Sequence, residues 1–244
     1  MTQLVSVTAR GLLDAWERAQ GAAPVLRPLL VLEAVTHEDA AALAALPLGV
    51  RDRLLLDLRR SALGERMACE AHCPACAEHI EFDVSTPALT CDAASAAEQR
   101  FEIEHEGWRI VFRVPTTADL IGCAGQGDDV ARRIALECVQ EARWSSVEVA
   151  RETLPDAALE AVGERCAALD PQADIELDLT CPACGHGWRS PFDIAAFLWS
   201  EIEAWAVRML GEIHVIASGY GWSEADILNL SPSRRRYYLE RLEA

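Results

Sequence analysis

The sequence contains no lysine and is short of positive charge altogether. All 22 basic residues are arginine, they face 39 acidic residues, and the formal net charge is −17. A chain with this balance repels polyanions over most of its surface, which argues against nucleic acid or an anionic membrane as a partner. The acidity favours solubility and is also suited to a basic protein partner.

Long apolar runs are missing as well. No run approaches the roughly 18 residues that cross a bilayer, and residues 1–20 lack the basic and apolar regions of a secretory signal. Apolar residues still make up 51% of the 244 residues, which excludes a disordered chain and allows one large or two small domains. We therefore expect a folded cytoplasmic protein.

The common catalytic motifs are absent too. The sequence has no G-x-S-x-G, no P-loop, no G-x-G-x-x-G and no H-E-x-x-H. We expect a protein that is not an enzyme, with no catalytic residues and no small-molecule substrate.

What the chain does have is cysteine. There are nine, an odd number without an export signal, which favours metal binding or burial over a disulfide framework. Three of them lie in apolar, helix-like stretches and are expected to be buried, unreactive thiols: Cys123, Cys138 and Cys166.

The tetrapeptide CPAC occurs twice, 108 positions apart. A Cys-x-x-Cys pair on a tight turn directs two thiolates at one zinc ion, and a structural zinc site needs four ligands. We predict that the two knuckles are halves of one site, with a single structural Zn²⁺ per chain held by Cys73, Cys76, Cys181 and Cys184. The residues between them then form an insertion into a zinc ribbon.

The residues after each knuckle support this pairing. A bulky apolar residue follows each second cysteine by four positions, Ile80 in one copy and Trp188 in the other. Gly185 suits the positive φ that such a turn needs, and Ala77 is the weaker match.

Two alternatives stay open. A thioredoxin-like redox pair would open a helix, but extended segments follow both knuckles. Alternatively, each knuckle could hold its own zinc with neighbouring ligands, namely Cys69, His72 and His79 for the first and His186 for the second.

Hydrophobic periodicity predicts an α+β protein that is mostly helical. Strands are expected at 79–84 and 173–180, with a hairpin over 100–114 that turns at Glu106-Gly107. Thr36 and Asp39 predict a capping box that opens a helix through Ala45. Further helices are expected at 8–20, 25–34, 48–64, 117–125, 128–143, 155–168, 194–219, 223–230 and 233–244.

The predicted domains follow from these elements. They are an N-terminal helical region (1–65), two halves of a central split zinc ribbon on β-hairpins (66–84 and 173–192), an inserted hairpin-plus-helices subdomain (85–172) and a C-terminal helical region (193–244).

The C-terminal segment combines aromatic residues with arginine, the residue types enriched at the centres of protein interfaces. We predict a partner-binding surface there, formed by Tyr220, Trp222, Arg234, Arg235, Arg236 and Tyr237. Two other interpretations are that the aromatic residues fill a helix–helix corner and that the arginines bind RNA.

Five segments together resemble the T-even-phage-like baseplate proteins of contractile phage tails and related contractile injection systems. They are ALPLGVRDRLLLDLR (45–59), the two CPAC knuckles, FRVPTTADL (112–120) and IHVIASGYGWSEADILNLSPSRRRYYL (213–239). The last segment is also similar to parts of phage tail assembly chaperones. Ala77 departs from the glycine expected after the first knuckle.

The resemblance implies a baseplate or baseplate hub assembly protein whose partners are baseplate, hub or spike proteins and which can be incorporated into an assembled particle. One alternative function is a tail assembly chaperone that is absent from the finished particle. A further alternative is a zinc-ribbon adaptor for nucleic acid.

Overall fold

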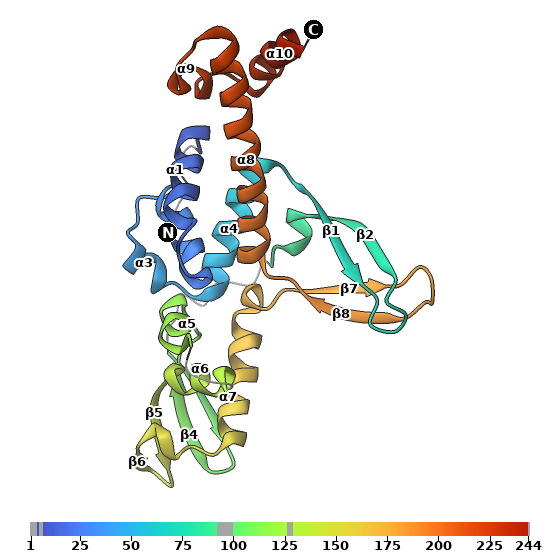
Figure 1. Cartoon of the computed structure of the whole chain (residues 1–244). Helices are drawn as coiled ribbons and strands as arrows, with labels where there is room; N and C mark the ends of the chain where they lie inside the picture. Colours follow the sequence, from blue (N-terminus) through green and yellow to red (C-terminus); the bar gives the residue numbers. More distant parts are fainter. Residues whose placement is uncertain (1–3, 5–6, 92–99, 126–128, 244) are drawn as a thin grey trace. The chain divides into compact units, whose positions relative to one another are not determined.

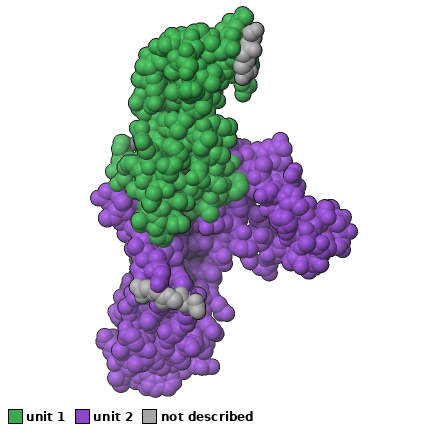
Figure 2. All heavy atoms as spheres, viewed as in Figure 1, with its two compact units in different colours: residues 1–37, 195–244 green, residues 38–194 purple. Residues whose placement is uncertain are grey.

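This computed structural model describes residues 4, 7–91, 100–125 and 129–243. The chain forms two compact units, one made of residues 1–37 and 195–244 and the other of residues 38–194 (Figure 2). Helices predominate and the strands form small antiparallel sheets, so the predicted α+β class is confirmed. Across the described residues, no helix is long and apolar enough to cross a membrane.

The first unit is helical and is built around one long helix (Figure 1). Buried residues recur every three or four positions along α8, including Leu198, Ile202 and Met209, as the sequence periodicity predicts. The side chain of Thr8 caps α1 by accepting a hydrogen bond from the Gly11 N–H. The elements are α1 (Ala9–Ala19), η1 (Pro24–Leu26), α2 (Arg27–Glu33), α8 (Ile194–Tyr220), α9 (Glu224–Leu228) and α10 (Pro232–Glu243).

The second unit contains a four-stranded antiparallel sheet in the order β3-β4-β5-β6. Ile110 and Phe112 on β4 are fully buried and belong to one core with Leu159 and Val162 on α7. The elements here are β3 (Phe101–His105), β4 (Trp108–Phe112), α5 (Thr117–Cys123), α6 (Val130–Cys138), β5 (Val139–Trp144), β6 (Val147–Val149), η3 (Arg151–Thr153) and α7 (Asp156–Leu169).

The predicted hairpin is present, but it is only half of this sheet. Glu106 and Gly107 both have positive φ, 46° and 85°, as a two-residue hairpin turn requires. Ser145 and Ser146 repeat this geometry between β5 and β6. The serine pair is a weaker turn signal than Glu-Gly, so the second hairpin was missed.

Two predicted helices need correction. The helix predicted at 128–143 covers only Val130–Cys138 and then becomes strand β5, because this segment pairs with β4 on one side and with β6 on the other. Residue 128 lies outside the described residues, as do 92–99 and 126–127 of the predicted insertion, 1–3 and 5–6 of the N-terminal region and residue 244.

The helix predicted from Thr36 begins later. Asp39 is the N-cap of α3 (Ala40–Ala44), and its carboxylate accepts a hydrogen bond from the Ala42 N–H. The Thr36 hydroxyl instead donates to the carbonyl of Leu32 (2.9 Å), at the end of the preceding helix.

A buried polar junction surrounds the start of α4 (Leu48–Leu63). Asp170 caps this helix from a distant part of the chain, since its Oδ2 accepts the Gly49 N–H at 2.8 Å. Arg51 is paired with Asp52 and also donates to the hydroxyl of Thr117. The segments 45–59 and 112–120, both singled out in the sequence, therefore meet in one place.

Two separate β-hairpins complete the second unit. They are formed by β1 (Arg66–His72) with β2 (His79–Ser85) and by β7 (Glu176–Thr180) with β8 (Gly187–Pro191), while the 3-10 turns η2 (Thr86–Leu89) and η4 (Pro171–Ala173) adjoin them. The division into ribbon halves and an insertion stays a prediction.

Candidate metal centre

Each CPAC knuckle forms the tip of a hairpin (Figure 1). The β1–β2 ladder runs without interruption from Arg66 paired with Ser85 to His72 paired with His79. The β7–β8 ladder ends in the same way, with Thr180 paired with Gly187. Regular strand pairing up to the last residue fixes both ends of each knuckle.

The two knuckles have the same backbone hydrogen bonds. In the first, the Cys73 N–H donates to the Glu78 carbonyl (2.9 Å) and the Ala77 N–H donates to the Cys73 carbonyl (2.8 Å). In the second, the Cys181 N–H donates to His186 (2.9 Å) and the Gly185 N–H to Cys181 (2.9 Å). The repeated tetrapeptide therefore forms a repeated turn.

The residue after each second cysteine has positive φ, 60° for Ala77 and 74° for Gly185. This left-handed conformation costs a non-glycine residue roughly 1 kcal/mol. The difference between the two sequences at this position is therefore a difference in strain and not in conformation.

All four knuckle sulfurs gather in one cluster. The Sγ atoms of Cys73, Cys76, Cys181 and Cys184 lie within 4.8 Å of one another. The Cys73–Cys184 and Cys76–Cys181 sulfurs are 3.7 Å and 3.6 Å apart. A tetrahedral zinc with bonds of about 2.3 Å separates its sulfurs by about 3.8 Å, so these distances fit four ligands of one ion.

The acid–base behaviour of these thiols points the same way. Burial opposes ionisation of Cys73, but hydrogen bonds from the backbone N–H groups of Cys76 and Ala75 bring its pKa down to about 7. A backbone hydrogen bond at Glu78 acts to lower the pKa of Cys76, yet the neighbouring thiols, Cys184 foremost, raise it to about 12. Four thiols this close cannot all ionise on their own, and a divalent cation removes that obstacle.

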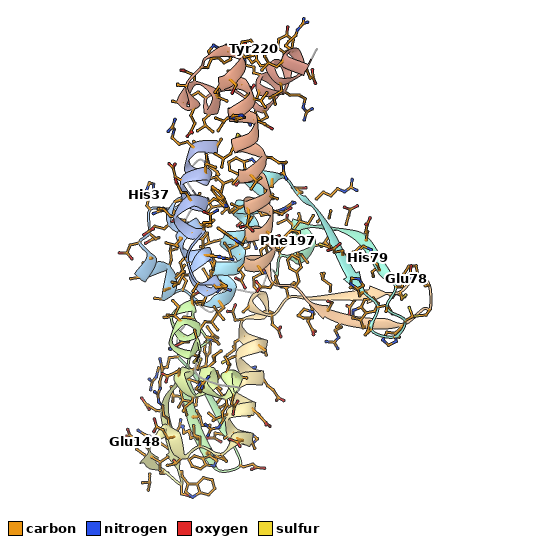
Figure 3. The ribbon with its side chains drawn as sticks, in the orientation of Figure 1. His37, Glu78, His79, Glu148, Phe197 and Tyr220 are labelled. Carbon is orange, nitrogen blue, oxygen red and sulfur yellow. The ribbon has the colours of Figure 1, made fainter. Side chains whose placement is uncertain are left out.

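The alternative ligands do not join a cluster of their own. Among the described residues, the four cysteines form the one group of three or more ligating side chains placed around a common point. His79 lies at the start of β2 next to Glu78 (Figure 3), and its Nε2 is 3.1 Å from Glu70 Oε2. His72 packs against the His79 ring at 5.0 Å, and His186 stacks on Trp188 at 6.1 Å.

The predicted partner residues lie in the other unit, around the end of α8. Tyr220, labelled in Figure 3, stacks on Trp222 with ring centroids 5.0 Å apart. Tyr238 meets both rings edge-on. Tyr237 is 53% exposed, and the Arg241 guanidinium lies 5.5 Å from its ring. The sequence interpretation did not include Tyr238 and Arg241, although helical spacing places Arg241 one turn after Tyr237.

The three predicted arginines have different environments. Arg235 is only 6% exposed, is paired with Glu212 at 3.0 Å and donates to the Leu230 carbonyl at 2.8 Å. It therefore joins α10 to α8 within the unit. Arg234 and Arg236 are exposed.

The comparison with known protein families settles the family. Residues 29–199 match the family described as T4 bacteriophage base plate protein. The chain belongs to this baseplate family. No curated protein and no solved structure gives a significant match. The match confirms the resemblance drawn from the sequence, and it includes the segments 45–59 and 112–120 and both knuckles, whereas the segment 213–239 lies beyond it.

Proposed function

We propose that this baseplate-family protein is a non-enzymatic assembly component of the baseplate or baseplate hub in a contractile phage-tail-like particle. The family match over residues 29–199 is the observation that carries the proposal. The protein would act in the cytoplasm, where such particles are assembled, and its partners would be other baseplate, hub or spike proteins.

One structural zinc ion completes the proposal. The four-cysteine cluster offers four thiolates at tetrahedral spacing, and a zinc ion with four protein ligands keeps no position open for a substrate water. The ion would be held by Cys73, Cys76, Cys181 and Cys184 and would join the tips of the two hairpins.

The aromatic and arginine side chains at the end of α8 and on α10 would form the partner surface. Tyr220, Tyr237, Arg234 and Arg236 are exposed, and Trp222 is half-buried and stacks on the ring of Tyr220. Arg235 would support this surface from inside through its pair with Glu212.

A peptide census of purified, fully assembled particles tests the function. A fixed ratio of this chain to the other baseplate subunits is expected. If the chain is missing from particles although its deletion stops assembly, it is a chaperone that leaves before completion. If deletion leaves assembly intact, the proposal is wrong.

A charge reversal tests the partner surface separately. Arg234→Glu with Arg236→Glu should abolish incorporation into particles while leaving the melting temperature unchanged. Arg208→Glu, at an exposed arginine on α8, is the matched control and should be incorporated normally. Equal incorporation of both variants would refute the assignment of this surface.

A further inference from the structure

Two buried cysteines outside the metal centre lie together in the core of residues 38–194. Cys138 ends α6 and is fully buried, and Cys166 lies on α7 and is 6% exposed. Cys166 belongs to the core formed by α7 and the four-stranded sheet, and its thiol is hydrogen-bonded to the thiol of Cys138. The sequence offered no reason to pair them, since they are separated by a strand hairpin and most of a helix.

A cavity of about 430 Å³ is lined by both cysteines, of which Cys166 keeps 6% of its surface exposed and Cys138 none. Its wall is mostly apolar and includes Pro115, Ile134 and Gly163 beside the two cysteines. The cavity opens to solvent, so a small reagent can approach Cys166, and Cys138 has to react only with Cys166 beside it. Its volume is sufficient for a short disulfide reagent.

The surroundings make the two thiols unequal. The Cys138 thiol, and less strongly the Arg113 guanidinium, lower the pKa of Cys166 against the opposing effect of burial. The interaction with Cys166 and burial together raise the pKa of Cys138. The Cys166 thiol lies 3.6 Å from the Arg113 carbonyl, to which it donates. Cys166 is also the cysteine of the pair that keeps exposed surface, 6% against none for Cys138, so it is the thiol that meets a reagent first.

We propose that Cys138 and Cys166 are a redox-modifiable dithiol, which a low-molecular-weight disulfide converts into an intramolecular disulfide. The Cys166 thiolate attacks one sulfur of the reagent, breaks its S–S bond and releases one small thiol. The Cys138 thiolate then attacks Cys166 Sγ in the mixed disulfide and releases the second small thiol. The protein loses two electrons and two protons, and the reagent becomes two thiols.

The test uses the full-length, zinc-loaded protein and cystamine as the reagent. Free thiols are then blocked by alkylation, and the digested peptides are mapped by mass spectrometry without reduction. We expect a cross-linked peptide pair containing Cys138 and Cys166, formed in the folded protein and lost on reduction. Cys123, a buried cysteine on α5, is the matched control and should stay a free thiol.

A second measurement asks whether the bond closes within the native fold. The cross-linked protein should melt several degrees above the same sample after reduction, because the disulfide restricts the unfolded chain. A mixed disulfide that never closes, unmodified Cys138 and Cys166, or a cross-link seen only above the melting temperature would each overturn the proposal. The same map reports whether the knuckle cysteines stay protected, so failure of the zinc assignment is seen separately.

Discussion

Replacing one knuckle cysteine should affect the zinc site strongly and the rest of the chain weakly. In Cys181→Ser, three thiolates remain in the cluster that now places four sulfurs within 4.8 Å of one another. Structural zinc sites contribute on the order of 10 kcal/mol or more of apparent binding free energy, so one of four ligands accounts for about 3 kcal/mol. Zinc affinity should therefore fall by roughly 100-fold.

The structural effect should be confined to the hairpins. The strands β1–β2 and β7–β8 are separate two-stranded sheets, and along β1 only Met67 is fully buried. Hydrogen exchange in these four strands should therefore accelerate in Cys181→Ser. Exchange in α7 and the four-stranded sheet should stay slow, because their apolar core does not include the knuckles.

The assay is a zinc titration against a chromogenic chelator, with metal content measured on the purified protein. Cys69→Ser is the matched control, because Cys69 lies on β1 close to the knuckle but outside the four-cysteine cluster. One zinc per chain is expected for the wild type and for this control. Wild-type affinity in Cys181→Ser, or two zinc ions per wild-type chain, would refute the single shared site.

Three further predictions concern buried residues within one unit or the other, and two of them carry a control substitution. Gly49→Ala would push a Cβ into the Asp170 carboxylate that caps α4, and it should lower the free energy of unfolding in urea by about 2 kcal/mol. Gly163→Ala, with open space around its Cβ, is the control and should be neutral or stabilising. Equal effects of the two substitutions would contradict the capping role of Asp170. Burial raises the pKa of Asp52 from 3.8 to about 6. Between those pH values the folded state holds a proton that the unfolded state has released, so the contribution of Asp52 to the free energy of unfolding falls as the pH rises. Asp52→Asn should remove this slope, and an unchanged difference in unfolding free energy between pH 4 and pH 7 would show that the residue titrates normally. In thermal melting, Arg235→Ala should lower the free energy of unfolding by about 2 kcal/mol, and Arg236→Ala should change it by no more than about 0.5 kcal/mol. The reverse order would contradict the burial of Arg235 and the exposure of Arg236.

The sequence was informative wherever a local pattern determines the structure. The apolar spacing of α8 and the turn at Glu106-Gly107 predicted their elements correctly, because both depend on neighbours within a few residues. The gathering of the four knuckle cysteines could also be predicted, although the two pairs are distant in sequence, since a structural zinc site requires four ligands and one knuckle supplies only two.

Features decided by tertiary pairing were missed. Residues 139–144 resemble the end of a helix in isolation and become β5 because two neighbouring strands supply its hydrogen bonds. The cap that Asp170 places on α4 joins residues 121 positions apart and leaves no local pattern. Arg235 looked the same as Arg234 and Arg236 in sequence, and only the packing of α10 gave it a buried partner.

The two hairpins approach each other both at their tips, where the four cysteine sulfurs gather, and near their bases. Near their bases, the side chain of Gln172 on η4 accepts the Cys91 N–H at 2.7 Å and donates to the Leu89 carbonyl on η2 at 3.0 Å. This amide bridges the exit of β2 and the approach to β7 independently of the metal. Because the bases are already adjacent, the zinc ion that we propose at the tips would have to order only the two short arms and not the whole intervening segment. That preorganisation would lower the entropic cost of closing one metal site from knuckles 108 positions apart, in keeping with the single shared ion that we propose.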